Sequence, residues 1–239
     1  NMQIYLLALI LGCCIPPLFV YLRNLLRNTV QTREDVEGKL NVPILATLPK
    51  VDDTQTKVDA SSRDLKSESF RMLRSNLRFL SGSIVQVTSS TPGEGKSFVA
   101  SNLAISLSHT GKRILLVGLD LRKPALPQIL PDVPMQRDRS VVAYLIGQIQ
   151  NPAETILDGK DKYGIDIAYS GSVPPNPTEL LSTDRLEQLL AYYRSNYDYV
   201  VLDSAPMMPV SDSILVNRFV DITLYVIRSE VTQNSMLDQ

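Results

Sequence analysis

Hydrophobic residues along this chain gather in short runs that alternate with segments of helical spacing. Five runs are predicted to form strands: 83–89, 113–120, 164–170, 197–204 and 221–229. Several of them are nearly continuous in apolar β-formers, as expected of parallel strands covered on both faces by helices. The helical segments lie near 97–110, 140–147, 184–196 and 212–218. This alternation predicts an α/β fold, with a mostly parallel central sheet flanked by helices.

The beginning of the chain is its most apolar part. No charged residue occurs from Ile4 to Leu22, and a helix of this length nearly matches a hydrocarbon core of roughly 30 Å. Arginines follow and no charge precedes, which favours a transmembrane helix with the rest of the chain in the cytoplasm. Pro16 and Pro17 should kink it, and a signal peptide or a buried soluble helix are the alternatives. We expect the chain to be the last part of a longer protein.

Three segments follow from these patterns. Residues 1–27 would form the transmembrane helix and a juxtamembrane segment, and 28–63 a connector with a short helix after Thr32 and a polar linker from residue 50. Residues 64–239 would form the α/β domain, with a C-terminal end that we expect to be incomplete. That domain opens with an amphipathic helix, whose apolar positions are Leu65, Phe70, Leu73, Leu77 and Leu80.

Composition excludes some classes of partner. The chain has 24 Lys and Arg against 25 Asp and Glu, so no basic field indicates a nucleic acid. Its two cysteines, Cys13 and Cys14, are adjacent within the apolar start, which suits neither an ordinary disulfide nor a metal site. We interpret them as small lipid-facing or helix-packing residues.

The strongest chemical signal is the segment VTSSTPGEGKSFVASNLAISL, in which a strand, a glycine-containing loop and a helix follow one another. Such a loop points backbone N–H groups at phosphates, and the helix adds its positive end. Lys96 would reach the β- and γ-phosphates of ATP, and the Ser97 hydroxyl would bind Mg²⁺. Ser90 stands where the usual pattern has glycine, and a fortuitous turn is the alternative. The expected nucleotide-binding residues are Pro92, Gly93, Glu94, Gly95, Lys96, Ser97 and Phe98.

Two aspartates belong with this loop. Asp203 closes the apolar run YVVLD and Asp120 closes ILLVGLD, so both fall at the carboxyl end of a predicted parallel sheet. A magnesium ion or its water would lie there. Each aspartate alone could instead cap a helix or a turn.

Together these segments resemble the bacterial tyrosine kinases of capsule and exopolysaccharide export, of the Wzc/CapB type, whose catalytic domain is similar to the Min and Par ATPases. The resemblance covers nearly the whole chain, including ESFRMLRSNLRFL, LDLRKP, PPNPTELLS and YDYVVLDSAPMMPVSD. It implies a P-loop NTPase fold, preceded by the last membrane span of a polysaccharide co-polymerase. It also implies an inner-membrane protein with a cytoplasmic kinase domain.

Roles carry over from this resemblance residue by residue. Lys96 and Ser97 correspond to the Walker A pair, Asp120 to the second Walker motif and Asp203 to the Walker B acid. Lys96, Asp120 and Asp203 would then be catalytic, and Ser97 with the two aspartates would hold the metal.

A further motif of the family concerns assembly. Glu68, Arg71 and Arg74 match a Glu-x-x-Arg-x-x-Arg helix that packs against a neighbouring subunit in rings of the family. From spacing alone, a solvated helix face with a local ion pair is the alternative.

Two departures from the family bear on activity. Gly118 stands where the family has the first aspartate of an Asp-x-Asp pair, which leaves the base for the tyrosine hydroxyl in doubt. No tyrosine follows Tyr225 before Gln239, so either the family's tyrosine-rich tail was removed or the natural protein lacks it.

Three functions are therefore weighed. The first is an ATP-dependent tyrosine kinase that phosphorylates the tyrosine-containing tail of a neighbouring copy and regulates polysaccharide assembly and export. The second is a catalytically weak, ATP-binding oligomeric module of the export machinery. The third is a positioning ATPase of the Min or Par kind.

Overall fold

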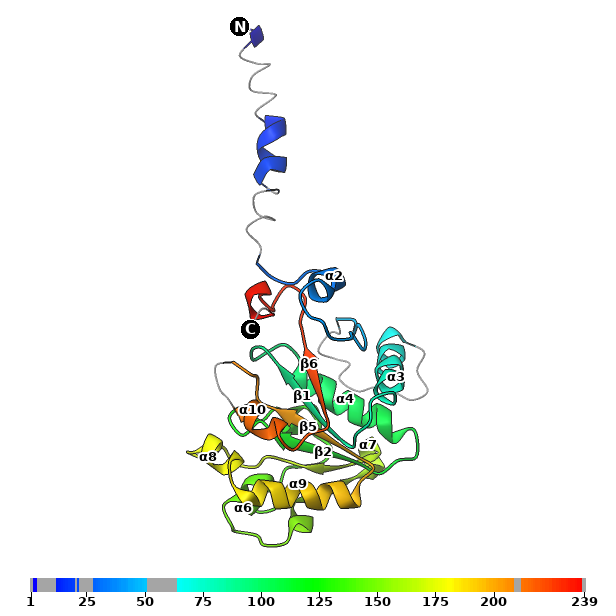
Figure 1. The fold of residues 1–239 in the computed structure, drawn as a ribbon, viewed down its shortest axis with the longest axis vertical. Helices are drawn as coiled ribbons and strands as arrows, with labels where there is room; N and C mark the ends of the chain where they lie inside the picture. The colour runs from blue at the N-terminus through cyan, green and yellow to red at the C-terminus, as the bar shows by residue number, and fades with distance from the viewer. Residues whose placement is uncertain are drawn as a thin grey trace. The chain divides into compact units, whose positions relative to one another are not determined.

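The computed structural model describes residues 2–3, 12–19, 21, 28–50, 64–208 and 212–237. It divides into two compact units, one of Asn1–Val42 with Arg228–Gln239 and one of Pro43–Ile227. The ribbon of each is drawn in Figure 1. Each unit is described by itself.

The first unit joins the two ends of the described chain. Thr29 forms an isolated antiparallel bridge with Gln233, near the 3-10 helix η2 (Asn234–Met236). The short helix expected after Thr32 is confirmed as α2 (Arg33–Glu37), and the Thr32 N–H donates to Asp35 Oδ2 at 2.9 Å. Most of the expected membrane span lies outside the described residues, as does the linker after Lys50. Within the described ranges no helix is long and apolar enough to cross a membrane.

The second unit is built on a six-stranded sheet of order β3-β4-β2-β5-β1-β6. In this sheet the pairs β4–β2, β2–β5, β5–β1 and β1–β6 are parallel, and the edge pair β3–β4 is antiparallel. The strands are β1 (Ile84–Ser89), β2 (Ile114–Leu119), β3 (Leu157–Gly159), β4 (Ile165–Ala168), β5 (Tyr199–Ser204) and β6 (Ile222–Val226). The five strands predicted from the apolar runs are thus confirmed, and so is the mostly parallel α/β fold.

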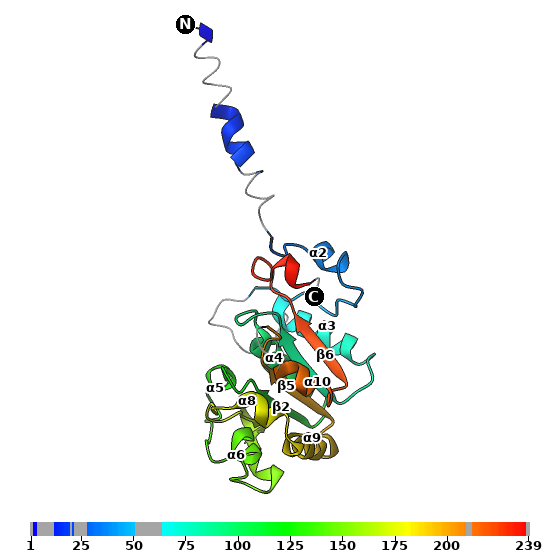
Figure 2. The same ribbon diagram turned by 60° about the vertical axis from the view of Figure 1, so that its left-hand side comes forward.

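Helices cover both faces of this sheet, as the two views in Figures 1 and 2 show. The α-helices are α3 (Leu65–Leu77), α4 (Lys96–Ser108), α5 (Leu126–Ile129), α6 (Val141–Leu145), α7 (Lys160–Tyr163), α8 (Pro177–Leu181), α9 (Asp184–Asn196) and α10 (Asp212–Asn217), with a 3-10 turn η1 at Pro152–Thr155.

Each strand contributes side chains to two hydrophobic cores, one on each face of the sheet, because successive side chains point to opposite faces. Val85 and Val87 of β1 pack into the core under α3 and α4, while Ile84 packs into the core under α6 and α9. Leu116 and Leu115 of β2 divide in the same way. This two-sided burial explains why these strands are apolar almost without interruption.

Some elements differ from the sequence prediction. The strand β3 and the short helices α5, α7 and α8 were not predicted, because each has five residues or fewer and too little periodicity to detect. The prediction of the apolar face of α3 was wrong at its ends. Phe70, Leu73 and Leu77 are buried, whereas Leu65 is 78% exposed and Leu80 is 36% exposed.

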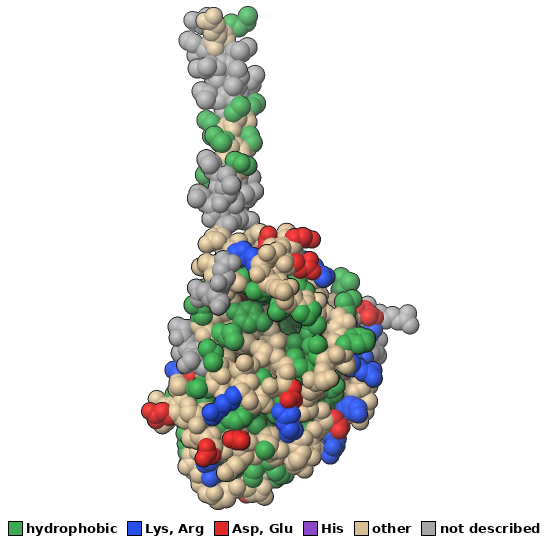
Figure 3. All heavy atoms as spheres, in the orientation of Figure 1, with side chains coloured by type: hydrophobic (Ala, Val, Ile, Leu, Met, Phe, Trp, Pro, Cys, Tyr) green, Lys and Arg blue, Asp and Glu red, His purple; other side chains and the backbone are tan. Residues whose placement is uncertain are grey.

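The topology brings three segments to one edge of the sheet. The loop after β1, Asp120 after β2 and Asp203 in β5 all lie at carboxyl ends of neighbouring parallel strands. In open α/β sheets, ligands bind outside this edge where the strand order reverses, and here β1 lies between β5 and β6. Elsewhere, Figure 3 shows acidic and basic side chains interspersed on the face displayed, in keeping with a formal net charge of -1.

Candidate functional site: a phosphate loop beside two aspartates

The loop between β1 and α4 is an open cradle. Gly93 and Gly95 have φ of 90° and 97°, a left-handed conformation that side-chain-bearing residues rarely adopt. A Cβ added at either glycine would meet no atom within 4 Å, so the backbone faces open space. Gly95 caps α4, whose first N–H groups therefore lie at the loop. The geometry is that of a loop able to surround phosphate groups with N–H donors.

Side chains of the loop hold its backbone in place. The Ser89 hydroxyl donates to the Thr91 carbonyl at 2.9 Å, and the Thr91 N–H donates to Glu94 Oε2 at 2.8 Å. Glu94 is buried, 3% exposed, so its carboxylate turns into the loop. Its place is therefore structural, and only its backbone can face phosphates.

Two other residues predicted to bind the nucleotide, Pro92 and Phe98, differ in their surroundings. Pro92 is exposed at the loop with Gly93. The Phe98 ring packs edge-on against Phe70 of α3, with ring centroids 5.9 Å apart. Only the backbone of Phe98, and not its side chain, is therefore available for contact with a nucleotide at the loop.

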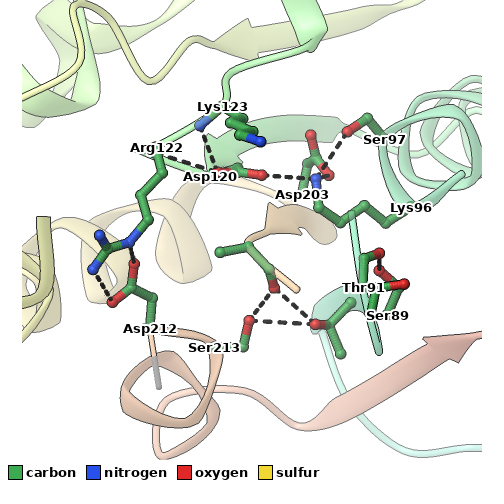
Figure 4. A network of polar contacts seen from close by, with 12 residues as sticks. Ser89, Thr91, Lys96, Ser97, Asp120, Arg122, Lys123, Asp203, Asp212 and Ser213 are labelled. Carbon is green, nitrogen blue, oxygen red and sulfur yellow. Dashed lines mark hydrogen bonds and ion pairs between the residues drawn. The ribbon is translucent and has the colours of Figure 1, made fainter. Parts of the chain in front are cut away.

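Lys96, Asp120 and Asp203 meet in the space beside the loop, as Figure 4 shows. The Lys96 ammonium lies 2.8 Å from Asp120 Oδ2 and 3.9 Å from Asp203 Oδ1. Asp120 is 3% exposed and Asp203 is 1% exposed. The Ser97 hydroxyl lies 3.4 Å from the same ammonium. The structure thus brings together all four residues that the sequence singled out for catalysis and metal binding.

Burial dominates the electrostatics of Asp203. It raises the pKa of this carboxyl from 3.8 to about 6, although the Lys96 ammonium and the Ser97 hydroxyl oppose the change. The charge on Asp120 adds to the rise. Asp203 Oδ1 is buried and makes no hydrogen bond with any residue that the structure describes. A bound cation would supply a closer contact than the Lys96 ammonium, which is 3.9 Å from this oxygen.

Asp120 is held more completely. Its Oδ1 accepts the backbone N–H groups of Arg122 at 3.2 Å and Lys123 at 2.9 Å, and its Oδ2 faces Lys96. The turn after β2 therefore fixes the carboxylate with its open side toward the phosphate loop.

Sequence reasoning missed an ion pair behind this turn, between the exposed Arg122 and the buried Asp212. Arg122 Nε donates to Asp212 Oδ2 at 2.6 Å, and Asp212 Oδ1 also accepts the Thr178 hydroxyl at 2.8 Å. Arg122 in turn donates to Thr178 Oγ1 at 2.8 Å. These residues come from the turn after β2, from α8 and from α10. The segments PPNPTELLS and PVSD contained the signal, but their spacing gave no reason to pair them.

The charged groups suit Mg²⁺ carried by a nucleotide. Among the described residues no group of three or more His, Cys, Asp or Glu could hold a metal ion alone. Magnesium is commonly held by one or two carboxylates together with substrate phosphates. Asp203, whose Oδ1 makes no hydrogen bond with any described residue, the Ser97 hydroxyl and Asp120 fit that arrangement, and Lys96 adds a cation for the phosphates.

Gly118 occupies a crowded place in this site. It pairs in register with Asp203, so a side chain there would lie on the same face of the sheet as Asp203. A Cβ at this position would lie 3.0 Å from the Ser170 backbone nitrogen and 3.4 Å from Leu126 Cδ1. A carboxylate at position 118 would therefore require a local adjustment of these neighbours.

The three residues expected to mediate assembly lie on α3. Glu68 and Arg71 form an ion pair within the helix. Arg74 instead donates to the Ser106 carbonyl of α4 at 2.6 Å. Arg74 therefore joins two helices of one chain. Arg71, which pairs with Glu68 within α3, is the position we test for a contact with another copy.

A hollow of about 740 Å³ lies away from this site, beside β3, and shares no residue with the phosphate loop. Asp158, Lys160 and Asp166 are among its lining residues, and Asp166 is paired with Lys160 at 3.0 Å. The convergent charges and the open loop, rather than this hollow, mark the candidate site.

Comparison with known proteins shows which family this chain belongs to. The sequence profile of the AAA-domain family matches residues 82–236. The solved BceF tyrosine kinase domain is 30% identical, with a TM-score of 0.76 over 87% of this chain and 90% of that one. The chain belongs to the AAA-domain family and, within it, to the bacterial tyrosine kinases.

Other relatives refine this placement. The tyrosine-protein kinase etk of Escherichia coli K12 is 30% identical over 93% of this chain. The chain covers 34% of the length of that protein, and it spans about one third of the length of the curated relatives it matches. The cell-division ATPase MinD of Pyrococcus furiosus, 20% identical with a TM-score of 0.52, shares the fold. The P-loop NTPase fold expected for this kinase family is thus confirmed.

The raised pKa of Asp203 makes stability depend on pH. Because the folded-state pKa exceeds the ordinary one, the protonated carboxyl stabilises the fold below about pH 4, and this contribution is lost as the pH rises through about 6. We expect Asp203→Asn, without nucleotide or magnesium, to raise the free energy of unfolding above pH 7 by up to roughly 3 kcal/mol. The gain should disappear near pH 4. Urea denaturation at both pH values measures it.

Asp198→Asn provides a control of opposite sign. The Arg113 backbone N–H lowers the pKa of Asp198, so its charge stabilises the fold above its unfolded pKa and ceases to do so as the pH falls through the folded one. This variant should therefore lose stability at neutral pH. A pH-independent effect of Asp203→Asn would refute the burial argument.

Proposed function

We propose that this chain is an ATP-dependent protein tyrosine kinase domain that phosphorylates tyrosines of a neighbouring copy. The observation that carries the proposal is the meeting of Lys96, Asp120 and Asp203 beside an open phosphate loop. Membership of the bacterial tyrosine kinases makes a tyrosine hydroxyl the expected acceptor.

The transfer is a single displacement at phosphorus. The tyrosine oxygen forms a bond with the γ-phosphorus while the bond to the bridging β,γ-oxygen breaks, and ADP leaves. The loop N–H groups and Lys96 would hold the phosphates in place, and Ser97 with the two aspartates would hold Mg²⁺, which neutralises charge on the phosphates. The tyrosine proton would pass to a carboxylate, for which Asp120 is placed by two backbone N–H groups.

The cellular role belongs to the same proposal. The relatives include a tyrosine-protein kinase of a cps region in Klebsiella pneumoniae. We infer that the whole protein regulates capsular or exopolysaccharide assembly and export. It would be anchored in the inner membrane by the apolar segment from Ile4 to Leu22, with the kinase domain in the cytoplasm.

Lys96→Met tests the catalytic assignment. It removes the ammonium next to both aspartates, and we expect phosphoryl transfer to a tyrosine peptide to fall about 100-fold or more. The assay uses labelled ATP, Mg²⁺ and a tyrosine-bearing tail peptide. Lys112→Met, an exposed lysine after α4, is the matched control and should keep full activity. Wild-type protein that binds ATP without any transfer would contradict kinase activity.

A catalytically weak, ATP-binding assembly module is the second candidate function, and Gly118 favours it. The family places a carboxylate there, and in this chain the position is both empty of charge and crowded by Ser170. Phosphoryl transfer can still proceed from positioning and charge neutralisation, but more slowly.

Gly118→Asp distinguishes the two candidates. If the missing carboxylate limits the rate, this variant should raise kcat about 10-fold or more, because a positioned base contributes at least that much. Gly118→Asn has the same size and the same crowding against Ser170, so it isolates the charge and should not raise kcat. Equal rates in all three proteins would show that the chain does not need a base at this position.

Assembly of several copies through α3 is part of both proposals. We expect Arg71→Ala to reduce the mean particle mass of the chain in mild detergent, measured by light scattering, because it removes a cation from the face proposed to contact a second copy. Arg71 is preferred to Arg74, which also supports α4. Arg78→Ala, at the exposed end of the same helix, is the control. Unchanged masses for Arg71→Ala would exclude this contact.

A further inference from the structure

The entrance to the phosphate loop is held by a residue from the far end of the domain. Ser90 is fully buried, and its hydroxyl lies 2.8 Å from the hydroxyl of Tyr225 on β6. The two residues are 135 positions apart in the sequence. A glycine, which the usual P-loop pattern has at this position, could not make this bond.

Ser90 also meets the segment that follows Asp203. Its carbonyl accepts the Met208 N–H at 3.0 Å, and the Ser89 carbonyl accepts the Met207 N–H at 2.8 Å. The loop is thus fixed on one side through its backbone and on the other through Tyr225. Removing the phenol hydroxyl would leave one of these two sides without its hydrogen bond.

The surroundings of Tyr225 suit this position. It lies opposite Thr88 in the parallel pairing of β6 with β1, so the strand register places its ring beside the start of the loop. It is 36% exposed, and its partial burial raises the pKa of the phenol, which keeps its proton at neutral pH. The buried Glu94 carboxylate adds to that rise, since it is close enough to Tyr225 to disfavour a second negative charge.

Ordering a loop before a ligand arrives reduces the entropy lost on binding. Two glycines with positive φ make the stretch from Thr91 to Gly95 easy to deform, so an anchor at its entrance matters for the alignment of its N–H groups. Ser90 is that entrance, and Tyr225 is its side-chain anchor.

We propose that Tyr225 is a positioning residue of the phosphate loop, which through the Ser90 hydroxyl orders the N–H groups that bind the polyphosphate of a nucleotide. This inference rests on the proposed nucleotide binding. Through Tyr225, strand β6 would thus contribute to the affinity of the loop for the phosphates of a nucleotide.

The test combines two single variants with their double. Tyr225→Phe and Ser90→Ala each remove one hydroxyl of the pair, and each should raise the Kd for Mg·ADP about 5- to 10-fold, as the loss of one hydrogen bond would. The double variant should bind no more weakly than either single one, because the two hydroxyls act through one contact. Tyr199→Phe, at the start of strand β5, should leave the Kd unchanged.

A second measurement needs no nucleotide. Hydrogen exchange of the loop amides from Thr91 to Gly95 should be about 5-fold faster in Tyr225→Phe than in the wild type, while the amides of α9 are unaffected. Unchanged exchange together with an unchanged Kd, or additive effects in the double variant, would overturn the proposal. If the wild type bound no ADP, the proposed function would fail, and the exchange rates alone would still decide the role of Tyr225.

Discussion

Two carboxylates and one ammonium share a buried space at the carboxyl edge of the sheet, and the surrounding structure keeps them there. Removing Asp120 and Asp203 from water is unfavourable, and the Lys96 ammonium offsets only part of that loss, as the raised pKa of Asp203 indicates. The parallel strands β2 and β5 hold the two acids near each other, because Gly118 pairs in register with Asp203 and the Asp120 N–H donates to the Asp203 carbonyl at 3.0 Å. The site is thus an arrangement that lowers stability locally and that the rest of the sheet has to support.

The arrangement depends on groups behind the site. The Arg122 backbone fixes Asp120, and its side chain is paired with Asp212 at the start of α10. Ser213, the next residue, contacts the Ala205 carbonyl just beyond Asp203. The segment after β5 is therefore connected to both carboxylates. It begins directly after the strand that carries Asp203, and Asp212 pairs with Arg122, whose backbone N–H holds Asp120. A displacement of α10 would change the surroundings of Asp120 and Asp203 together, because the same short segment supports both.

The sequence predicted the parts of the fold that follow from local patterns. The apolar runs predicted β1, β2, β4 and β5, since strands buried on both faces have almost no polar positions. They also predicted the edge strand β6, in which buried and more exposed positions alternate. The edge strand β3 escaped, because three residues with one exposed position carry too little pattern. The same limit applies to α3, where Leu65 fits the helical spacing but lies beyond the core that Phe70 and Leu77 enter.

The candidate site divides in a similar way. Lys96, Ser97, Asp120 and Asp203 could be predicted because each follows a strand or a loop of known chemistry. Tyr225 with Ser90, and Arg122 with Asp212, could not, because such pairs depend on strand order and register rather than on local spacing. The long-range partners that adjust the site are therefore visible only in the folded chain.

Gly118 shows how these effects combine. A third carboxylate on the same face as Asp203 would place three negative charges around one ammonium, and like-charge repulsion would raise the pKa of Asp203 further. With glycine there, Asp203 ionises more readily and remains available to a cation near neutral pH. The same glycine removes a candidate base and a negative charge that would attract a cation, while it lowers the repulsion that Asp203 experiences. For that reason, affinity for Mg·ATP and rate of transfer need not change in the same direction in this chain.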